Sequence, residues 1–219
     1  MHSEPVDARI AGLGAEENAD ALFDKFRARA EAVAARVSLV STVEEAASLI
    51  TSAADVPSLT GRYTTTNAVL SAFSQLPAAL SSHGRSIFLA EDIAAAAELD
   101  TESVFDNPQS KVTAALAGDI GIILAIAGVA ETGSVLCVDE TLAARLLGMI
   151  ADSVYVLLPV EKIVPSLDEM GELLSGFTTA GSRYLSLVTG PSRTADIERV
   201  LTIGVQGPKM LHVLVIGTV

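Results

Sequence analysis

The chain is poor in the residues that many cofactor sites and nucleic-acid surfaces require. It has one cysteine, no tryptophan, and 14 Lys and Arg against 27 Asp and Glu, so its formal net charge is −13 at pH 7. A single thiol excludes an internal disulfide, and it is too few for a cysteine-ligated zinc site or iron–sulfur cluster on this chain. The negative charge repels phosphate backbones, so we expect no nucleic-acid partner.

Long apolar runs are also missing, although half of the residues are hydrophobic. The longest run, residues 120–130, is followed by Glu131 and is much shorter than the roughly 20 residues that span a bilayer. Residues 1–5 do not show the basic and then apolar pattern of a secretory signal. We therefore expect a cytoplasmic protein with no membrane span.

Several common catalytic motifs are absent as well. Residues 12–14, Gly-Leu-Gly, lack the third glycine of a dinucleotide-binding fingerprint, and residues 207–209, Gly-Pro-Lys, do not form a phosphate-binding loop. The three histidines, His2, His83 and His212, are far apart and share no metal-ligand spacing. We therefore predict no metal site, and we expect His212 to be packed within a strand.

Hydrophobic periodicity predicts alternating strands and helices. The expected strands are residues 38–40, 86–90, 120–128, 134–138, 153–158, 184–188 and 211–216. The expected helices are residues 16–37, 42–53, 68–73, 110–117, 142–150 and 166–177, with capping boxes that begin at Thr42 and Ser166. Cys137, within an expected strand, is interpreted as a small core residue.

This alternation predicts an α/β fold, an open and mainly parallel sheet flanked by helices. Since aromatic residues make up only 4% of the chain, the core must consist mainly of Ala, Val, Leu and Ile. No linker is long enough to divide the chain. We predict an N-terminal helical appendage over residues 1–37 and one α/β folding unit over residues 38–219.

Polar residues concentrate in three bends beside expected strands. These are residues 130–134 (Ala-Glu-Thr-Gly-Ser), 189–198 (Thr-Gly-Pro-Ser-Arg-Thr-Ala-Asp-Ile-Glu) and 204–208 (Gly-Val-Gln-Gly-Pro). Open α/β sheets place ligands at the carboxyl ends of strands, and an arginine fork suits a carboxylate or phosphate. The alternative is architectural: a hairpin with Gly133 at positive φ, a capped surface turn in which Arg193 pairs with Asp196, and a tight turn.

The candidate ligand-binding residues follow from these bends. They are Glu131, Thr132, Gly133, Ser134, Gly190, Ser192, Arg193, Thr194, Asp196 and Gln206. Arg193 would anchor an anion, Ser192 and Thr194 would donate hydrogen bonds, and Asp196 would orient Arg193. Other cations near turns in this half of the chain are Arg145, Lys162 and Lys209.

Taken in this order, the bends resemble the lactate-utilisation protein C family, also called the LUD domain and including YkgG-like proteins. The family pattern runs A-E-T-G-[ST], an arginine-bearing helix, K-I-V-P, S-G-P-S-R-T-A-D-I-E and G-V-H-G-P-x-x-L-H-V. The matching positions here are residues 130–134, Arg145, 162–165, 189–198 and 204–213. Thr189 replaces a serine, and Gln206 stands where the family usually has histidine, so a titrating group is lost there.

The resemblance implies a fold similar to sugar-phosphate isomerases and coenzyme A transferases. It implies a subunit of a system that oxidises L-lactate to pyruvate together with iron–sulfur partner proteins. Such a subunit would hold no cofactor, bind a small anionic metabolite, and act within the complex rather than as a stand-alone enzyme. One alternative is a coenzyme A transferase-like enzyme in which Glu131 is the catalytic nucleophile. Another is an enzyme similar to the folate cyclo-ligases.

Overall fold

The computed structural model of the chain describes residues 19–52, 61–93, 116–117, 119–139, 141–178, 184–194, 202–203 and 207–217. The helices are α2 (Ala19–Ala32), α3 (Val43–Ser52), α4 (Asn67–Ala72), α5 (Leu76–Ser82), α8 (Leu142–Ile150) and α9 (Leu167–Thr178), with the short 3-10 helix η1 (Val160–Lys162). Within these residues, none of the helices has the length and apolar character that crossing a bilayer requires.

Nine strands of the described residues form one sheet, and two more form a separate ribbon. The sheet contains β1 (Arg36–Val40), β2 (Tyr63–Thr65), β3 (Ile87–Leu89), β4 (Ile120–Val129), β5 (Ser134–Asp139), β6 (Ser153–Pro159), β7 (Ile163–Val164), β8 (Tyr184–Val188) and β11 (Met210–Ile216). The ribbon pairs β9 (Arg193–Thr194) with β10 (Thr202–Ile203) in antiparallel register.

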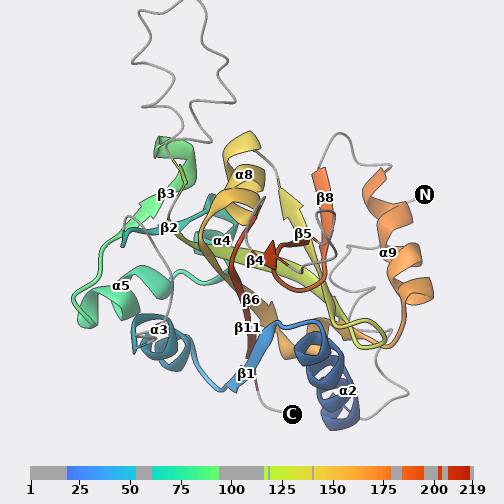
Figure 1. Cartoon of the computed structure of the whole chain (residues 1–219). Coiled ribbons are helices and arrows are strands. Elements are labelled where there is room, and N and C mark those ends of the chain that lie inside the picture. The colour runs from blue at the N-terminus through green and yellow to red at the C-terminus, as the bar shows by residue number, and fades with distance from the viewer. Residues whose placement is uncertain are drawn as a thin grey trace, which may run out of the picture.

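The main layer is a parallel sheet in the order β3-β2-β4-β6-β11-β1 (Figure 1). Its central strand β6 is buried on both faces, because alternate side chains enter two different cores. Val154 and Val156 join the core with α2 and α8, whereas Tyr155 and Leu157 join the core with α3 and α5. Burial on both faces explains why this strand is a continuous apolar run rather than an alternating one.

Strand β4 belongs to two layers. Residues 120–124 pair in parallel with β6, whereas residues 125–129 pair antiparallel with β5, and the register shifts between Ala125 and Ala127. Strand β8 then adds antiparallel to β5, and β7 pairs with the end of β4. We call the second half of β4 together with β5, β7 and β8 the side sheet.

The predicted fold class is confirmed: the structure is an α/β sheet that is mostly parallel and flanked by helices. The helix at 142–150 and the strand at 184–188 have the predicted bounds. Cys137 is buried in β5, as predicted. The expected helix at 110–117 lies largely outside the described residues.

One expected boundary was wrong, and two elements were not predicted. Helix α2 ends at Ala32 rather than residue 37, because Ala34 has a φ of 67° and β1 begins at Arg36. The short strand β2 was not predicted. Helix α5 was not predicted either; it contains Pro77 in its first turn, where proline is tolerated.

Helix α2 packs into the main core rather than apart from it. Phe26 is fully buried, and Leu22, Phe23 and Ala30 belong to the same core as Val156 of β6. The division into an appendage at 1–37 and a folding unit at 38–219 stays a prediction, because folding units are defined by unfolding experiments.

Candidate functional site

The first two polar bends lie against each other at one end of the side sheet. Strands β5 and β8 pair with Val135 opposite Val188, so the residues just beyond this pair are neighbours. The Ser134 and Thr189 hydroxyl oxygens lie 2.7 Å apart, and Thr132 Oγ1 lies 2.8 Å from Ser134 Oγ. Three hydroxyl groups therefore form a hydrogen-bonded chain that joins the bends.

The glycines of these bends face helix α2. Gly133 and Gly190 have φ values of 69° and 74°, in the left-handed region that favours glycine. A Cβ on Gly133 would lie 2.2 Å from the Ala30 backbone nitrogen, and one on Gly190 would lie 2.4 Å from the Val33 carbonyl oxygen. Gly133 therefore faces the end of α2, and Gly190 faces Val33, the residue that follows α2. Neither position has room for a side chain.

Glu131 is exposed in the β4–β5 hairpin and is held by helix α9. Its Oε2 atom accepts a hydrogen bond of 3.1 Å from the backbone N–H of Leu167, the first residue of α9. A carboxylate at a helix N-terminus satisfies a free backbone donor and interacts favourably with the helix dipole. The described contacts of Glu131 are thus those of a helix cap.

The second bend continues into the β9–β10 ribbon. The backbone N–H of Ser192 donates to the Pro208 carbonyl at 2.9 Å, which brings the second bend beside the start of β11. Arg193 lies in β9 opposite Ile203, and its side chain is exposed. The backbone of Thr194 follows it in β9. Asp196 and Gln206 lie outside the described residues.

The other candidate cations have neighbours of their own. The Arg145 guanidinium lies 4.7 Å from the centre of the Tyr184 ring, and Lys209 Nζ lies 3.3 Å from Asp152 Oδ1. Within the described ranges, Arg193 forms no ion pair. Its guanidinium is therefore a charge that an anion could bind.

The main sheet shows which edge these bends occupy. Gly190 contacts Val33, just before β1, and Ser192 contacts Pro208, just before β11. Both neighbours lie at the amino ends of parallel strands, so residues 189–192 lie at the amino edge of the main sheet. They follow the carboxyl end of β8, but β8 belongs to the side sheet.

The carboxyl edge of the main sheet carries polar residues that the sequence analysis did not select. Glu91 Oε1 accepts hydrogen bonds from the Asn67 backbone N–H at 3.4 Å and from Thr141 Oγ1 at 3.5 Å. Thr66 caps α4 and Thr141 caps α8. The polar run at 64–67, directly before a predicted helix, was the sequence signal that could have identified this edge.

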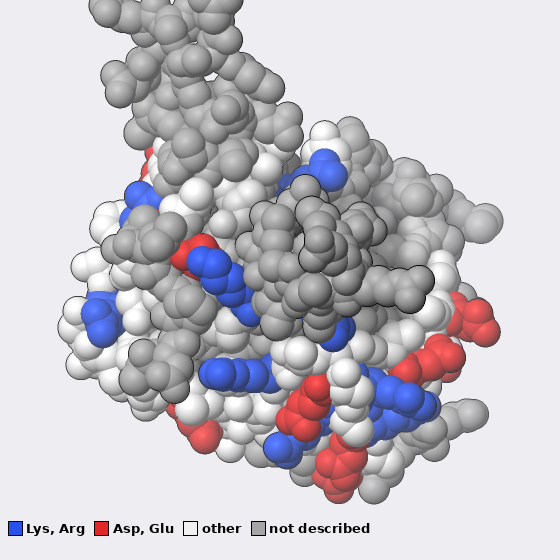
Figure 2. Space-filling view, viewed as in Figure 1, with Lys and Arg blue, Asp and Glu red and all other residues white. Residues whose placement is uncertain are grey.

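The distribution of metal-ligating and charged side chains limits the classes of ligand that the described surface can bind. Among the described residues, no group of three or more His, Cys, Asp and Glu side chains has the arrangement of a metal site. Lys and Arg side chains are mixed with Asp and Glu over α2 on the face in Figure 2. This mixed pattern favours small ligands or polar protein surfaces over an extended polyanion.

Comparison with known proteins places the chain among related sequences. Residues 23–216 match the family model described as LUD domain. Lactate utilization protein C 1 of Bacillus mycoides is 32% identical over 105 residues, which are 47% of this chain and 45% of that protein. Lactate utilization protein C of an Exiguobacterium strain is 28% identical over 143 residues, which are 61% and 62% of the two chains.

Uncharacterized protein YkgG of Escherichia coli is 30% identical over 100 residues, which are 44% of this chain and 43% of that protein. These alignments cover between about two fifths and three fifths of the relatives. The crystal structure of a DUF162 family protein from Deinococcus radiodurans superposes with a TM-score of 0.59 at 19% identity, covering 91% of this chain and 99% of that chain. At this identity the likeness shows a shared fold.

Proposed function

Because the chain belongs to the LUD domain family, we propose that it serves in L-lactate utilisation as a non-redox subunit that binds a small anionic metabolite beside Arg193. Relatives named lactate utilization protein C support the process. The exposed Arg193, which has no ion pair within the described residues, carries the proposal for the ligand. The metabolite would be L-lactate or its oxidation product pyruvate.

The residues near Arg193 supply chemistry that suits a short hydroxy or keto acid. A guanidinium can hold both oxygens of a carboxylate with two parallel hydrogen bonds. Ser192 stands next to Arg193 in the chain, and its hydroxyl group can donate to or accept from a 2-hydroxy or 2-keto group. Thr194, Asp196 and Gln206 remain predicted members of this site.

Oxidation of lactate to pyruvate releases two electrons and two protons, so an electron acceptor is required. This chain has one thiol, Cys137, and it is buried in the core. We therefore assign the redox centres to partner proteins, for which iron–sulfur clusters suit electron transfer. In this proposal the present chain positions the carboxylate and the partners accept the electrons.

A binding experiment with one charge-matched control tests the site. We expect L-lactate and pyruvate to bind the purified chain, and Arg193→Ala to weaken both by at least about tenfold, the loss of one charge-assisted pair. Lactamide, which lacks the carboxylate, should not bind. Arg85→Ala is the control, because Arg85 is also exposed but contacts Tyr63 in β2 of the main sheet. Equal weakening by both variants would count against the site.

Growth on L-lactate as the sole carbon source tests the process separately. Deletion of the gene should abolish growth, wild type and Arg85→Ala should restore it, and Arg193→Ala should not. Normal growth of the deletion strain would overturn the role in lactate utilisation. Normal growth with Arg193→Ala would remove Arg193 from that role.

A further inference from the structure

A cavity of about 350 Å³ lies at the carboxyl ends of β2 and β3, away from the candidate site residues that the structure describes. It is lined by Thr65, Leu70, Pro77, Ile87, Phe88, Leu89, Asp92 and Ile93. Its size is within the range of small-molecule sites in proteins. Thr65 and Leu89 are the last residues of two paired parallel strands, which is the edge where α/β sheets usually bind ligands.

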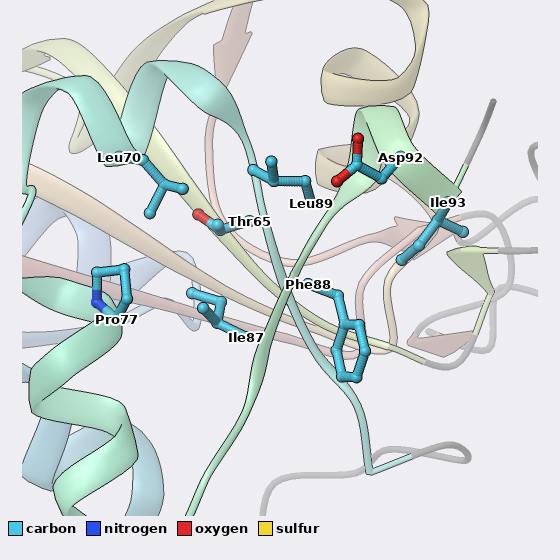
Figure 3. A pocket seen from close by; sticks show the side chains of 8 residues that line it. All are labelled: Thr65, Leu70, Pro77, Ile87, Phe88, Leu89, Asp92 and Ile93. Atoms are coloured by element: carbon cyan, nitrogen blue, oxygen red, sulfur yellow. The ribbon is translucent and has the colours of Figure 1, made fainter. Parts of the chain in front are cut away.

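Most of the lining is hydrocarbon. Figure 3 shows Leu70, Pro77 and Ile87 on one side of the β3 ribbon and Phe88 and Ile93 on the other. Phe88 keeps 48% of its surface exposed, although most large apolar residues of the described chain are buried. A ligand with an apolar body would cover this surface and gain hydrophobic stabilisation roughly in proportion to the area buried.

Neither of the two polar side chains that line the cavity offers a ligand a hydrogen-bond donor. Thr65 has no exposed surface and its Oγ1 donates its proton to the Ile122 carbonyl at 3.0 Å, so it has no proton left to donate to a ligand. Asp92 is exposed and contributes a carboxylate, which accepts but does not donate when ionised. Among the described residues, no Lys, Arg or His lines the cavity. These side chains therefore favour a ligand whose polar part donates hydrogen bonds, and the carboxylate of Asp92 favours a positive charge over a negative one.

We propose that this cavity is a second ligand site, which binds a small molecule with an apolar body and a protonated amine or other hydrogen-bond donor. It is separate from the proposed anion site, because residues 189–192 lie at the amino edge of the main sheet. The carboxylate of Asp92 disfavours the anions lactate and pyruvate as its ligands. Such a site would let a metabolite of a different class bind while the anion site is occupied.

Three probes with one ring system and different charges test this proposal. Tryptamine is cationic, tryptophol is a neutral donor and indole-3-acetate is anionic. Binding is followed by the methyl NMR signals of Leu70, Ile87, Leu89 and Ile93 on the full chain. We expect tryptamine and tryptophol to shift these signals, with tryptamine binding at least about fivefold more tightly than indole-3-acetate, the ratio that one exposed charge contact gives.

Two exposed lining residues allow substitutions that leave the fold intact. Asp92→Asn should weaken tryptamine about fivefold and leave tryptophol unchanged. Phe88→Ala should weaken both. The matched controls are Asp168→Asn and Leu167→Ala, which change an exposed acid and an exposed apolar residue at the start of α9. Neither control should affect the probes, and Arg193→Ala should not affect them either.

The proposal is overturned if neither tryptamine nor tryptophol shifts the four methyl signals at about 10 mM, a concentration at which a ligand with a Kd of about 1 mM is mostly bound. It is also overturned if indole-3-acetate binds as tightly as tryptamine, or if Asp92→Asn changes all three probes equally. These experiments do not use lactate. A negative result would therefore overturn the second site and leave the anion site untouched, and failure of lactate to bind would leave the second site untouched.

Discussion

The hydroxyl groups of Ser134 and Thr189 lie 2.7 Å apart and join two polar bends that are 55 residues apart in the chain. Ser134 is buried, and its hydroxyl also lies 2.8 Å from Thr132 Oγ1. A bond between bends that approach from different strands fixes how these bends face each other. The geometry of the proposed anion site therefore depends on this pair.

The first prediction concerns the coupling between these two residues. Ser134→Ala and Thr189→Val should each lower the free energy of unfolding by about 1 kcal/mol, the net value of one hydrogen bond. The double variant should cost less than the sum, with a coupling of about 0.5–1.5 kcal/mol in denaturant unfolding. Full additivity of the two costs would show that the hydroxyl groups do not interact.

A series of glycine substitutions separates backbone strain from steric contact. Gly190→Ala should cost more than about 3 kcal/mol, because the residue has positive φ and its Cβ would lie 2.4 Å from the Val33 carbonyl. Gly84→Ala should cost about 1 kcal/mol, since Gly84 has a φ of 70° and open space around it.

Gly171→Ala is the control in this series. Gly171 lies inside α9, and a Cβ added there would meet nothing within 4 Å, so alanine should stabilise the chain by about 0.5–1 kcal/mol. Thermal unfolding of the three variants should give the order Gly171→Ala, Gly84→Ala, Gly190→Ala, from most to least stable. A mild effect at Gly190 would show that α2 does not press against the second bend.

The role of Glu131 can be tested through helix α9. Glu131→Ala should destabilise the chain by about 1 kcal/mol, because the Leu167 N–H loses its acceptor and the helix N-terminus loses a negative charge. Glu131→Gln keeps an acceptor oxygen and should lose about half as much. Asp168→Ala, in the same first turn, is the control for charge alone.

The same residue was the candidate nucleophile of a coenzyme A transferase. Incubation with an acyl-CoA followed by mass spectrometry should show no adduct on Glu131 if it serves as a cap. An adduct that disappears in Glu131→Gln would establish the enzymatic alternative instead.

The elements that the sequence predicted share a physical property. Residues 153–158 and 184–188 are apolar runs bounded by turn residues, and 142–150 has its apolar side chains on one helical face, so local pattern alone defines them. The strand at 63–65 has no such pattern. Its threonines can be buried because their hydroxyl groups are satisfied: Thr64 donates to Asp119, and Thr65 donates to the Ile122 carbonyl. Both acceptors are distant in the chain, so local pattern does not reveal them.

The candidate site shows the same division. The architectural alternative included a turn with Gly133 at positive φ, and the structure has this turn between β4 and β5. It also brings the first two polar bends together through Ser134 and Thr189. The sequence did not indicate that β4 turns from the main sheet into the side sheet. In α/β sheets ligands usually bind at the carboxyl ends of strands, and we applied this rule to the loop after β8. Because β8 belongs to the side sheet, that loop lies at the amino edge of the main sheet. The cavity beside Thr65, at the carboxyl edge, was not predicted.

The buried ion pair between Asp119 and Arg62 should contribute more to stability than an exposed pair. Asp119 has no exposed surface, Arg62 donates to both of its carboxylate oxygens, and Thr64 Oγ1 donates at 2.7 Å. Asp119→Ala should therefore cost about 3–5 kcal/mol, because it removes the carboxylate to which a partly buried guanidinium and a buried hydroxyl donate.

Lys209→Ala is the control for this comparison, since the Lys209 side chain is 42% exposed and its pair with Asp152 lies at the surface. It should cost less than about 1 kcal/mol in the same denaturant titration. Similar costs for the two variants would mean that burial does not govern the Asp119 pair.

His212 should make stability depend on pH. Burial, together with the positive charge of Arg36 on the paired strand, lowers the pKa of His212 from 6.5 to about 4. Its Nε2 atom lies 2.9 Å from Ser38 Oγ, and its ring packs against Tyr155, which suits a neutral imidazole. Between pH 6.5 and pH 4 the unfolded chain binds a proton that the folded chain does not. Stability should therefore fall as the pH decreases through this window, by about 2–3 kcal/mol in total.

The substitution His212→Gln should remove this part of the pH dependence, because glutamine does not titrate. The relevant measurement is the difference in unfolding free energy between wild type and variant at each pH, since carboxylates titrate in both proteins. His83→Gln is the control substitution, as His83 is exposed at the end of α5. If wild type and His212→Gln keep a constant difference from about pH 7 to about pH 4, the imidazole is not held neutral by its surroundings. The packing of β1 against β11 would then have to accommodate a charged ring.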